Sequence, residues 1–180
     1  PNITKFREMK MLKEIYEQAE TIRNCFRGKI RHIENISISK ENIKRIIFVS
    51  CGTSYYASLV GKYILEKTSH IPVVVEHASE FRYRHPMLYP TDLVIAVSQS
   101  GETADTLEAI RLSKKLSCSV AGIVNVTGSS IARECGQGMY LHAGPEIGVA
   151  STKAFTSQIT AIILLNVSLN KDPYYQAYLQ

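Results

Sequence analysis

The sequence lacks the cysteine and histidine patterns that build small metal-bound or disulfide-linked domains. Its four cysteines are far apart, and no Cys-x-x-Cys pair occurs among Cys25, Cys51, Cys118 and Cys135. Neither a structural zinc site nor a disulfide framework is therefore expected. The five histidines show no ligand spacing either. We expect no bound metal ion and no cofactor.

Long apolar runs and blocks of one charge are also missing. The run 161–165 is too short to cross a bilayer. The first twenty residues are charged, unlike a signal peptide, so a cytoplasmic location without membrane contact is expected. The net charge is +5 and the pI about 9.0. Because no Lys/Arg block has aromatic residues interleaved with it, nucleic-acid binding is not expected. Dispersed basic charge suits an anionic small molecule equally well.

Two nucleotide-binding motifs are absent. No Gly-x-Gly-x-x-Gly follows the first predicted strand, so a dinucleotide site lacks its usual sequence pattern. No Gly-x-x-x-x-Gly-Lys-Ser/Thr occurs, which argues against a nucleoside triphosphate.

Apolar runs and helical patterns alternate along most of the chain. With 180 residues and 45% hydrophobic residues, one globular domain is expected. Five apolar runs predict strands at 45–50, 72–75, 93–97, 119–124 and 139–142. Helical patterns are found at 55–67, 78–84, 107–116, 128–136 and 153–169. Strands that are apolar on both sides predict an α/β fold, a doubly wound parallel five-stranded sheet with helices on both faces.

An amphipathic helix is predicted before the sheet. Apolar residues recur every three or four positions from Phe6 to Phe26, with charged residues between them. This helix is expected to cover a sheet or a partner subunit. We divide the chain into an N-terminal helix and connector at 1–45, a sheet domain at 46–170 and an unassigned tail at 171–180.

Two hydroxyl-rich turns, 51–54 and 98–103, follow the first and third strands. In the flavodoxin-like strand order 2-1-3-4-5, these turns meet where ligands bind. Helix N-termini attract anions there, and the hydroxyls of Ser98, Ser100 and Thr103 add donors beside Gln99. The alternative is that Ser100 or Thr103 only caps the following helix. A phosphate held by hydroxyls and amides, without Mg²⁺ ligands, suits a phosphosugar.

Four motifs carry a resemblance to a known family. They are Cys51-Gly-Thr-Ser-Tyr, Ala78-Ser-Glu-Phe-Arg-Tyr-Arg, Ser98-Gln-Ser-Gly-Glu-Thr-Ala-Asp-Thr and Glu146-Ile-Gly-Val-Ala-Ser-Thr-Lys-Ala-Phe-Thr. Together they resemble the SIS (sugar isomerase) domains, and more narrowly the isomerase part of the glutamine:fructose-6-phosphate aminotransferases, the glucosamine-6-phosphate synthases. The resemblance implies a flavodoxin-like fold. It also implies a set of substrate-binding residues: Thr53, Ser54, Ser98, Gln99, Ser100, Thr103, Val149 and Ser151.

The resemblance also implies a function. Enzymes of that family convert fructose 6-phosphate and glutamine into glucosamine 6-phosphate and glutamate, the first step of hexosamine synthesis. The chain resembles the first of their two SIS domains, and we find no motif of their glutaminase domain or second SIS domain. Hexose phosphate binding without catalysis is therefore expected, with no catalytic residue in this chain. The expected partners are fructose 6-phosphate or glucosamine 6-phosphate, the remaining domains and a second copy in a homodimer.

Other functions stay open from the sequence. The same hydroxyl turns would serve a sugar-phosphate-sensing module of a regulator, another phosphosugar isomerase or a dimerisation module.

Several single residues are expected to be structural. Lys153 is not expected to form an imine, and Glu146 is expected to accept hydrogen bonds from backbone amides. Glu102 is expected to point away from the phosphate and to add charge to the first helical turn, and Cys51 to be a small buried residue.

Overall fold

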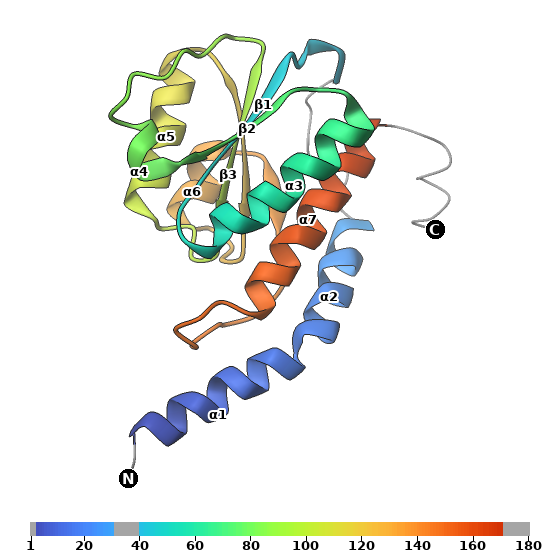
Figure 1. The fold of residues 1–180 in the computed structure, drawn as a ribbon, viewed down its shortest axis with the longest axis vertical. Helices are drawn as coiled ribbons and strands as arrows, with labels where there is room; N and C mark the ends of the chain where they lie inside the picture. Colours follow the sequence, from blue (N-terminus) through green and yellow to red (C-terminus); the bar gives the residue numbers. More distant parts are fainter. Residues whose placement is uncertain (1–2, 31–39, 171–180) are drawn as a thin grey trace.

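A computed structural model of the chain describes residues 3–30 and 40–170 and shows a parallel five-stranded sheet (Figure 1). The strands are β1 (Arg45–Ser50), β2 (Val73–His77), β3 (Asp92–Ser98), β4 (Ser119–Val124) and β5 (Gly138–Tyr140). Their order in the sheet is β2-β1-β3-β4-β5, and every neighbouring pair is parallel. The predicted fold class and strand order are confirmed.

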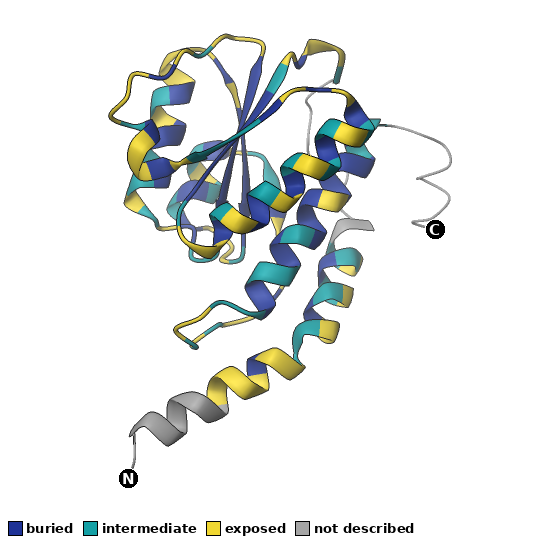
Figure 2. Ribbon diagram, viewed as in Figure 1, coloured by how far each residue is buried: buried dark blue, intermediate teal, exposed yellow. Residues whose placement is uncertain are grey.

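Helices cover both faces of the sheet, which explains why the strands are apolar without alternation (Figures 1 and 2). One face packs against α3 (Thr53–Ser69) and α7 (Lys153–Asn170), and α2 (Gln18–Ile30) packs against α7. The other face packs against α4 (Ala78–Phe81), α5 (Ala104–Lys115) and α6 (Ser130–Cys135). Every residue of β3 is buried, because its neighbours in the sheet lie on both sides and helices lie above and below it. A short 3-10 turn, Lys40–Asn42, precedes β1.

The N-terminal segment forms two helices where the sequence predicts one. The first, α1, covers Ile3–Tyr16, and a turn at Glu17 separates it from α2. Side chains compete for the backbone carbonyls at this bend. Gln18 Nε2 donates to the carbonyl of Ile15, and Thr21 Oγ1 donates to the carbonyl of Gln18. The bend lets α2 pack against α7 while α1 continues away from the sheet (Figure 1).

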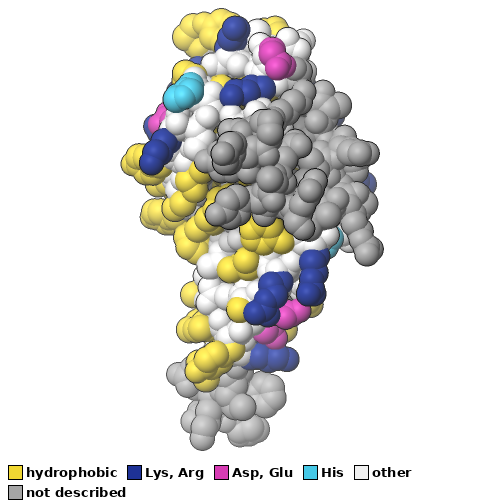
Figure 3. Space-filling view, turned by 90° about the vertical axis from the view of Figure 1, so that its right-hand side faces the viewer, with side chains coloured by type: hydrophobic (Ala, Val, Ile, Leu, Met, Phe, Trp, Pro, Cys, Tyr) yellow, Lys and Arg dark blue, Asp and Glu magenta, His cyan; other side chains and the backbone are white. Residues whose placement is uncertain are grey.

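Most of the described apolar side chains of α1 are exposed. Leu12 is 52% exposed and Tyr16 79%, and Met11 and Ile15 are also classed as exposed. In the lower part of Figure 3, where α1 lies, hydrophobic side chains at one edge accompany charged side chains of both signs. The expected covering role therefore belongs to α2 within this chain. The side chains of Phe6 and Met9 lie outside the described ones.

Several predicted boundaries differ from the observed ones. The predicted strand 139–142 runs from Gly138 to Tyr140, because the chain turns at His142 with φ 53°. The predicted helix 78–84 ends at Phe81. The polar segment 28–44 was predicted to be an irregular connector, but α2 includes residues 28–30; residues 31–39 and the tail 171–180 lie outside the described residues. Within 3–30 and 40–170, we find no helix that is both long and apolar enough to cross a membrane.

Candidate functional site

A pocket of about 230 Å³ opens at the carboxyl ends of β1 and β3. It is lined by Cys51, Thr53, Ser54, Val97, Ser98, Gln99, Ser100, Thr103 and Ser151. Seven of the eight predicted substrate-binding residues therefore lie together at the point where the strand order reverses. Val149 is the exception, because its side chain is 90% exposed and lies outside the pocket lining.

The turn after β3 presents two hydroxyls side by side. Ser98 Oγ and Thr103 Oγ1 are 3.1 Å apart, and the backbone N–H of Gly101 donates to Ser98 Oγ at 3.0 Å. Thr103 occupies the N-cap position of α5, but its side chain makes no capping hydrogen bond. Ser100 Oγ accepts from the N–H of Glu102 at 3.2 Å. The Thr103 hydroxyl therefore lies against Ser98 Oγ and does not cap the helix.

This turn is also fixed to the neighbouring helix α6. The carboxylate of Glu102 accepts from the N–H of Ser130 at 2.8 Å. Hydrogen bonding to the Ser130 side chain and to this N–H lowers the pKa of the Glu102 carboxyl. Gly101 has φ +68°, and its carbonyl accepts from the N–H of Ile131 at 2.9 Å. A Cβ at this position would overlap Ser129 Oγ, so the close approach needs glycine. As predicted, Glu102 does not line the pocket, but its charge lies at the start of α6 rather than α5.

The other side of the pocket belongs to α3 and to a residue that sequence reasoning missed. Thr53 and Ser54 lie in the first turn of α3 rather than in the preceding turn. Gln158 of α7 donates from Nε2 to Ser54 Oγ at 2.8 Å, and Gln158 is only 1% exposed. Because that hydrogen bond occupies an acceptor position of Ser54, the hydroxyl proton stays available for another partner. The signal in the sequence was a glutamine within a largely apolar helix, which also contains Asn166 and Asn170.

The charge environment of the pocket favours an anion. Among the residues that the structure describes, no lysine, arginine, aspartate or glutamate lines it. The N-termini of α3 and α5 both point into it, and the first N–H groups of a helix lack intrahelical partners and carry partial positive charge. The N-terminus of α7 is different, because Glu146 Oε1 accepts from Thr152 N at 2.8 Å and from Ala154 N at 3.1 Å. A bound anion would therefore interact chiefly with α3, α5 and the hydroxyls.

The loop before α7 is held by ion pairs and hydrogen bonds. The amide contacts of Glu146 confirm its predicted role as an acceptor from backbone N–H groups, and Ser151 Oγ also donates to Glu146 Oε2 at 2.9 Å. Lys153 is 4% exposed, and its Nζ lies 2.7 Å from Glu17 Oε2. The hydrogen bond from Lys153 lowers the pKa of the Glu17 carboxyl. Lys153 is thus paired at the bend between α1 and α2, as its predicted structural role requires.

The cysteines offer a direct probe of the pocket. Cys51 was predicted to be buried, but it is partly exposed because it lines the pocket; Cys25, Cys118 and Cys135 are buried. Burial raises the pKa of the Cys118 thiol to about 11 and that of Cys135 to about 12.

We therefore expect iodoacetamide at pH 8 to alkylate Cys51 first, since the thiolate is the reactive form. Mass spectrometry after timed labelling should also show that saturating fructose 6-phosphate slows labelling of Cys51. Equal labelling with and without ligand would place the ligand elsewhere.

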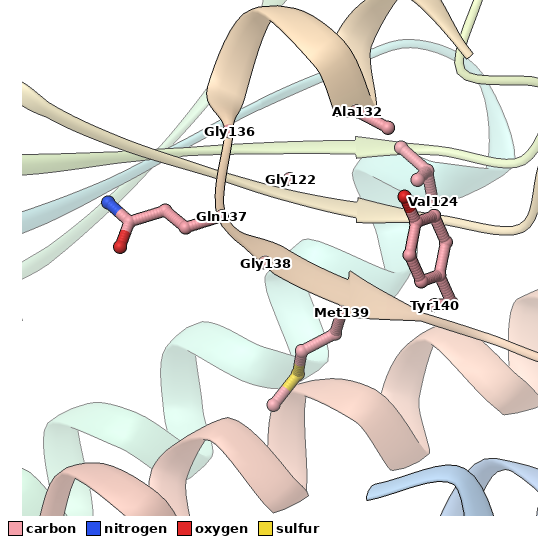
Figure 4. Close-up of a pocket in the computed structure, with 8 residues that line it drawn as sticks. All are labelled: Gly122, Val124, Ala132, Gly136, Gln137, Gly138, Met139 and Tyr140. Atoms are coloured by element: carbon pink, nitrogen blue, oxygen red, sulfur yellow. The ribbon is translucent and has the colours of Figure 1, made fainter. Parts of the chain in front are cut away.

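A second pocket, of about 350 Å³, lies at the outer strand β5 (Figure 4). Its lining consists of Gly122, Val124, Ala132, Gly136, Gln137, Gly138, Met139 and Tyr140. In Figure 4 the side chain of Met139 points toward the opposite side of the strand from that of Tyr140. Within the described part of the chain, this lining offers one hydroxyl, that of Tyr140, and no helix N-terminus with several free amides. It is larger than the first pocket but less suited to a phosphate.

A family model described as SIS domain matches residues 38–168. The chain belongs to the SIS domain family. This confirms the family resemblance carried by the four sequence motifs. The pocket at the ends of β1 and β3 thus lies within an SIS domain. It is formed by the segments 51–54 and 97–103 and by Ser151 of the loop before α7.

Curated relatives are about half identical to this SIS domain over the aligned residues. It is 51% identical over 170 residues to the glutamine–fructose-6-phosphate aminotransferase [isomerizing] of Chlorobaculum tepidum, covering 89% of this chain and 28% of that protein. It is 52% identical over 171 residues to the same-named protein of Bacteroides thetaiotaomicron, covering 90% of this chain and 28% of that protein. The chain thus spans little more than a quarter of the length of these relatives.

Solved structures agree with the fold. The C-terminal domain of glucosamine-fructose-6-phosphate aminotransferase from Francisella tularensis matches with a TM-score of 0.85 and 42% identity, covering 94% of this chain and 51% of that chain. A glucosamine-6-phosphate deaminase from Thermotoga maritima matches with a TM-score of 0.71 and 24% identity, covering 94% and 52%. The second match shows the shared fold alone. The narrower prediction, a resemblance to the aminotransferase, is confirmed by the first match and by the curated relatives.

Proposed function

We propose that this SIS domain binds the phosphate ester of a hexose, fructose 6-phosphate or glucosamine 6-phosphate, in the pocket at the ends of β1 and β3. The observation that carries the proposal is the convergence of hydroxyls and two helix N-termini on one pocket, whose described lining residues include no charged side chain. In this arrangement Ser98, Ser100 and Thr103 hold the phosphate with Gln99. Thr53, Ser54 and Ser151 contact the rest of the ligand.

The relatives' names support a place for this binding step in a larger reaction. They are aminotransferases that act on fructose 6-phosphate with glutamine. The described residues of the pocket lining supply hydroxyls, an amide and a thiol but no carboxylate, imidazole or amine. General acid–base catalysis and imine formation need such groups. The domain therefore binds the sugar phosphate, while the reacting groups come from other domains of a complete enzyme. We place that enzyme in the cytoplasm as a homodimer. For this chain we propose the same division as above, into an N-terminal helix and connector at 1–45, a sheet domain at 46–170 and a tail at 171–180.

Isothermal titration calorimetry on the purified chain tests the proposal. We expect both fructose 6-phosphate and glucosamine 6-phosphate to bind, and unphosphorylated fructose to give no detectable heat, because it lacks the anion that the helix N-termini attract. We also expect no conversion of fructose 6-phosphate by the isolated chain. Binding of fructose as tight as that of its phosphate, or measurable isomerisation by the chain, would contradict the proposal.

A further inference from the structure

The loop that carries Ser151 is fastened to the N-terminal helix α1. Glu14 is only 5% exposed although it lies on a helix whose other described side chains are mostly exposed. Its Oε1 accepts from the N–H of Ile147 at 2.6 Å, and both of its oxygens accept from the N–H of Gly148, at 3.2 and 3.1 Å. A buried carboxylate bound by two backbone amides is a strong local constraint, because hydrogen bonds to charged acceptors are the stronger ones.

The same loop leaves room for this carboxylate. A Cβ on Gly148 would lie 2.5 Å from Glu14 Oε2, so any larger residue would displace the carboxylate. The end of the loop is also tied to the N-terminal helices, since Lys153 pairs with Glu17 at 2.7 Å. Figure 1 shows this loop between the start of α7 and α1. The segment 147–153 is therefore held at both ends, at its first two backbone amides by Glu14 of α1 and at the Lys153 side chain by Glu17 of the turn before α2.

Glu146, the residue before Ile147, connects this fixed part of the loop to the pocket residue Ser151. Glu146 accepts from Ser151 Oγ at 2.9 Å and from the N–H of Thr152 at 2.8 Å. Among the described residues that line the pocket, Ser151 is the one that lies outside the segments 51–54 and 97–103. Its position over the pocket thus depends on a loop whose tip is fixed by Glu14 rather than by the sheet.

We propose that Glu14 is a positioning residue for the sugar-binding side of the pocket, an inference that rests on the proposed function. Glu14 does not line the pocket and touches no ligand; it holds the 146–152 loop so that Ser151 faces the sugar. The phosphate side, Ser98 to Thr103, is fixed separately to α6 through Gly101 and Glu102. Loss of Glu14 should therefore weaken recognition of the sugar and leave recognition of the phosphate unchanged.

Glu14→Ala separates these two effects. By NMR titration of the full chain, its affinity for fructose 6-phosphate should fall about tenfold, the loss of one hydrogen-bonded group. Its affinity for inorganic phosphate, followed at the amides of Ser100 and Gly101, should stay unchanged. Without ligand, the amide protons of Ile147 and Gly148 should exchange faster than in the wild type. Gly148→Ala should reproduce all three results by displacing the carboxylate, and Glu14→Gln, which keeps one carbonyl acceptor, should restore part of the affinity.

Glu20→Ala is the matched control. It removes the same charge from the N-terminal helices, but Glu20 is exposed and pairs only with Arg23 at 3.6 Å among the described side chains. It should bind both ligands as the wild type does. Unchanged fructose 6-phosphate affinity in Glu14→Ala and Gly148→Ala would overturn this inference but not the proposed function. An equal loss of affinity for fructose 6-phosphate and inorganic phosphate would do the same. Failure of the wild type to bind any phosphosugar would overturn the proposed function and the inference together.

Discussion

The double substitution Ser98→Ala/Thr103→Ala is expected to weaken phosphosugar binding at least about a hundredfold. Hydrogen bonds to a charged group contribute roughly 1.5–3 kcal/mol each, so the two together amount to about 3 kcal/mol or more, and each 1.4 kcal/mol is a factor of ten. The two hydroxyls lie 3.1 Å apart, close enough to bind one phosphate group together. Calorimetric titration with fructose 6-phosphate measures the loss.

A matched control separates this loss from a general effect of removing two hydroxyls. Thr68 and Ser69 lie at the far end of α3, where Thr68 Oγ1 donates to Ile64 O and Ser69 Oγ donates to Leu65 O. Thr68→Ala/Ser69→Ala should lower thermal stability and bind the phosphosugar as the wild type does. If the folded Ser98→Ala/Thr103→Ala protein binds within about threefold of the wild type, the phosphate does not lie at this turn.

The largest expected effect on stability is that of Gly138→Ala. Gly138 begins β5 with φ +145°, a conformation that residues with a Cβ rarely adopt. A Cβ there would overlap the backbone carbonyl of Gly122 on β4, and a backbone atom in a sheet cannot rotate away as a side chain can. Backbone strain and overpacking together are expected to lower the free energy of unfolding by about 3–5 kcal/mol. Urea unfolding followed by circular dichroism measures this.

Gly136→Ala is the matched control for the backbone conformation. Gly136 ends α6 with φ +69°, and a Cβ on it would have no neighbour within 4 Å. The strain of a left-handed conformation costs about 1–2 kcal/mol without any steric overlap. The free energy of unfolding of Gly136→Ala should therefore be lower than that of the wild type by roughly that amount. An equal loss in the two variants would mean that Gly138 is required only for its φ and not for the approach of β5 to β4.

Local sequence patterns were enough to predict the sheet. Buried strands such as Arg45–Ser50 and Ser119–Val124 agree with the apolar runs, because parallel strands covered on both faces need continuous apolar residues. The bend at Glu17 was not predictable from periodicity. The apolar spacing continues through it, and the bend depends on carbonyls shared with Gln18 and Thr21 and on packing against α7.

The candidate site was predicted where it depends on chain order and missed where it depends on distant contacts. The strand order brings the 51–54 and 98–103 turns together, so Thr53, Ser98 and Thr103 share a pocket. Glu14 lies 133 residues before its partner Ile147, and no spacing rule connects a helix to a loop across that distance. Whether the seven residues bind a sugar phosphate stays a prediction.

The packing of α7 has a consequence for how the chain folds during synthesis. Ile162, Leu164 and Leu165 of α7 belong to the apolar cluster on one face of the sheet. That helix is the last described element, so all five strands are synthesised before it. A ribosome adds about 5–20 residues each second, and exposed apolar surface on a partly folded chain promotes aggregation. One face of the nascent sheet is thus incomplete until α7 emerges, and chaperones that bind apolar surfaces have their longest opportunity on that face.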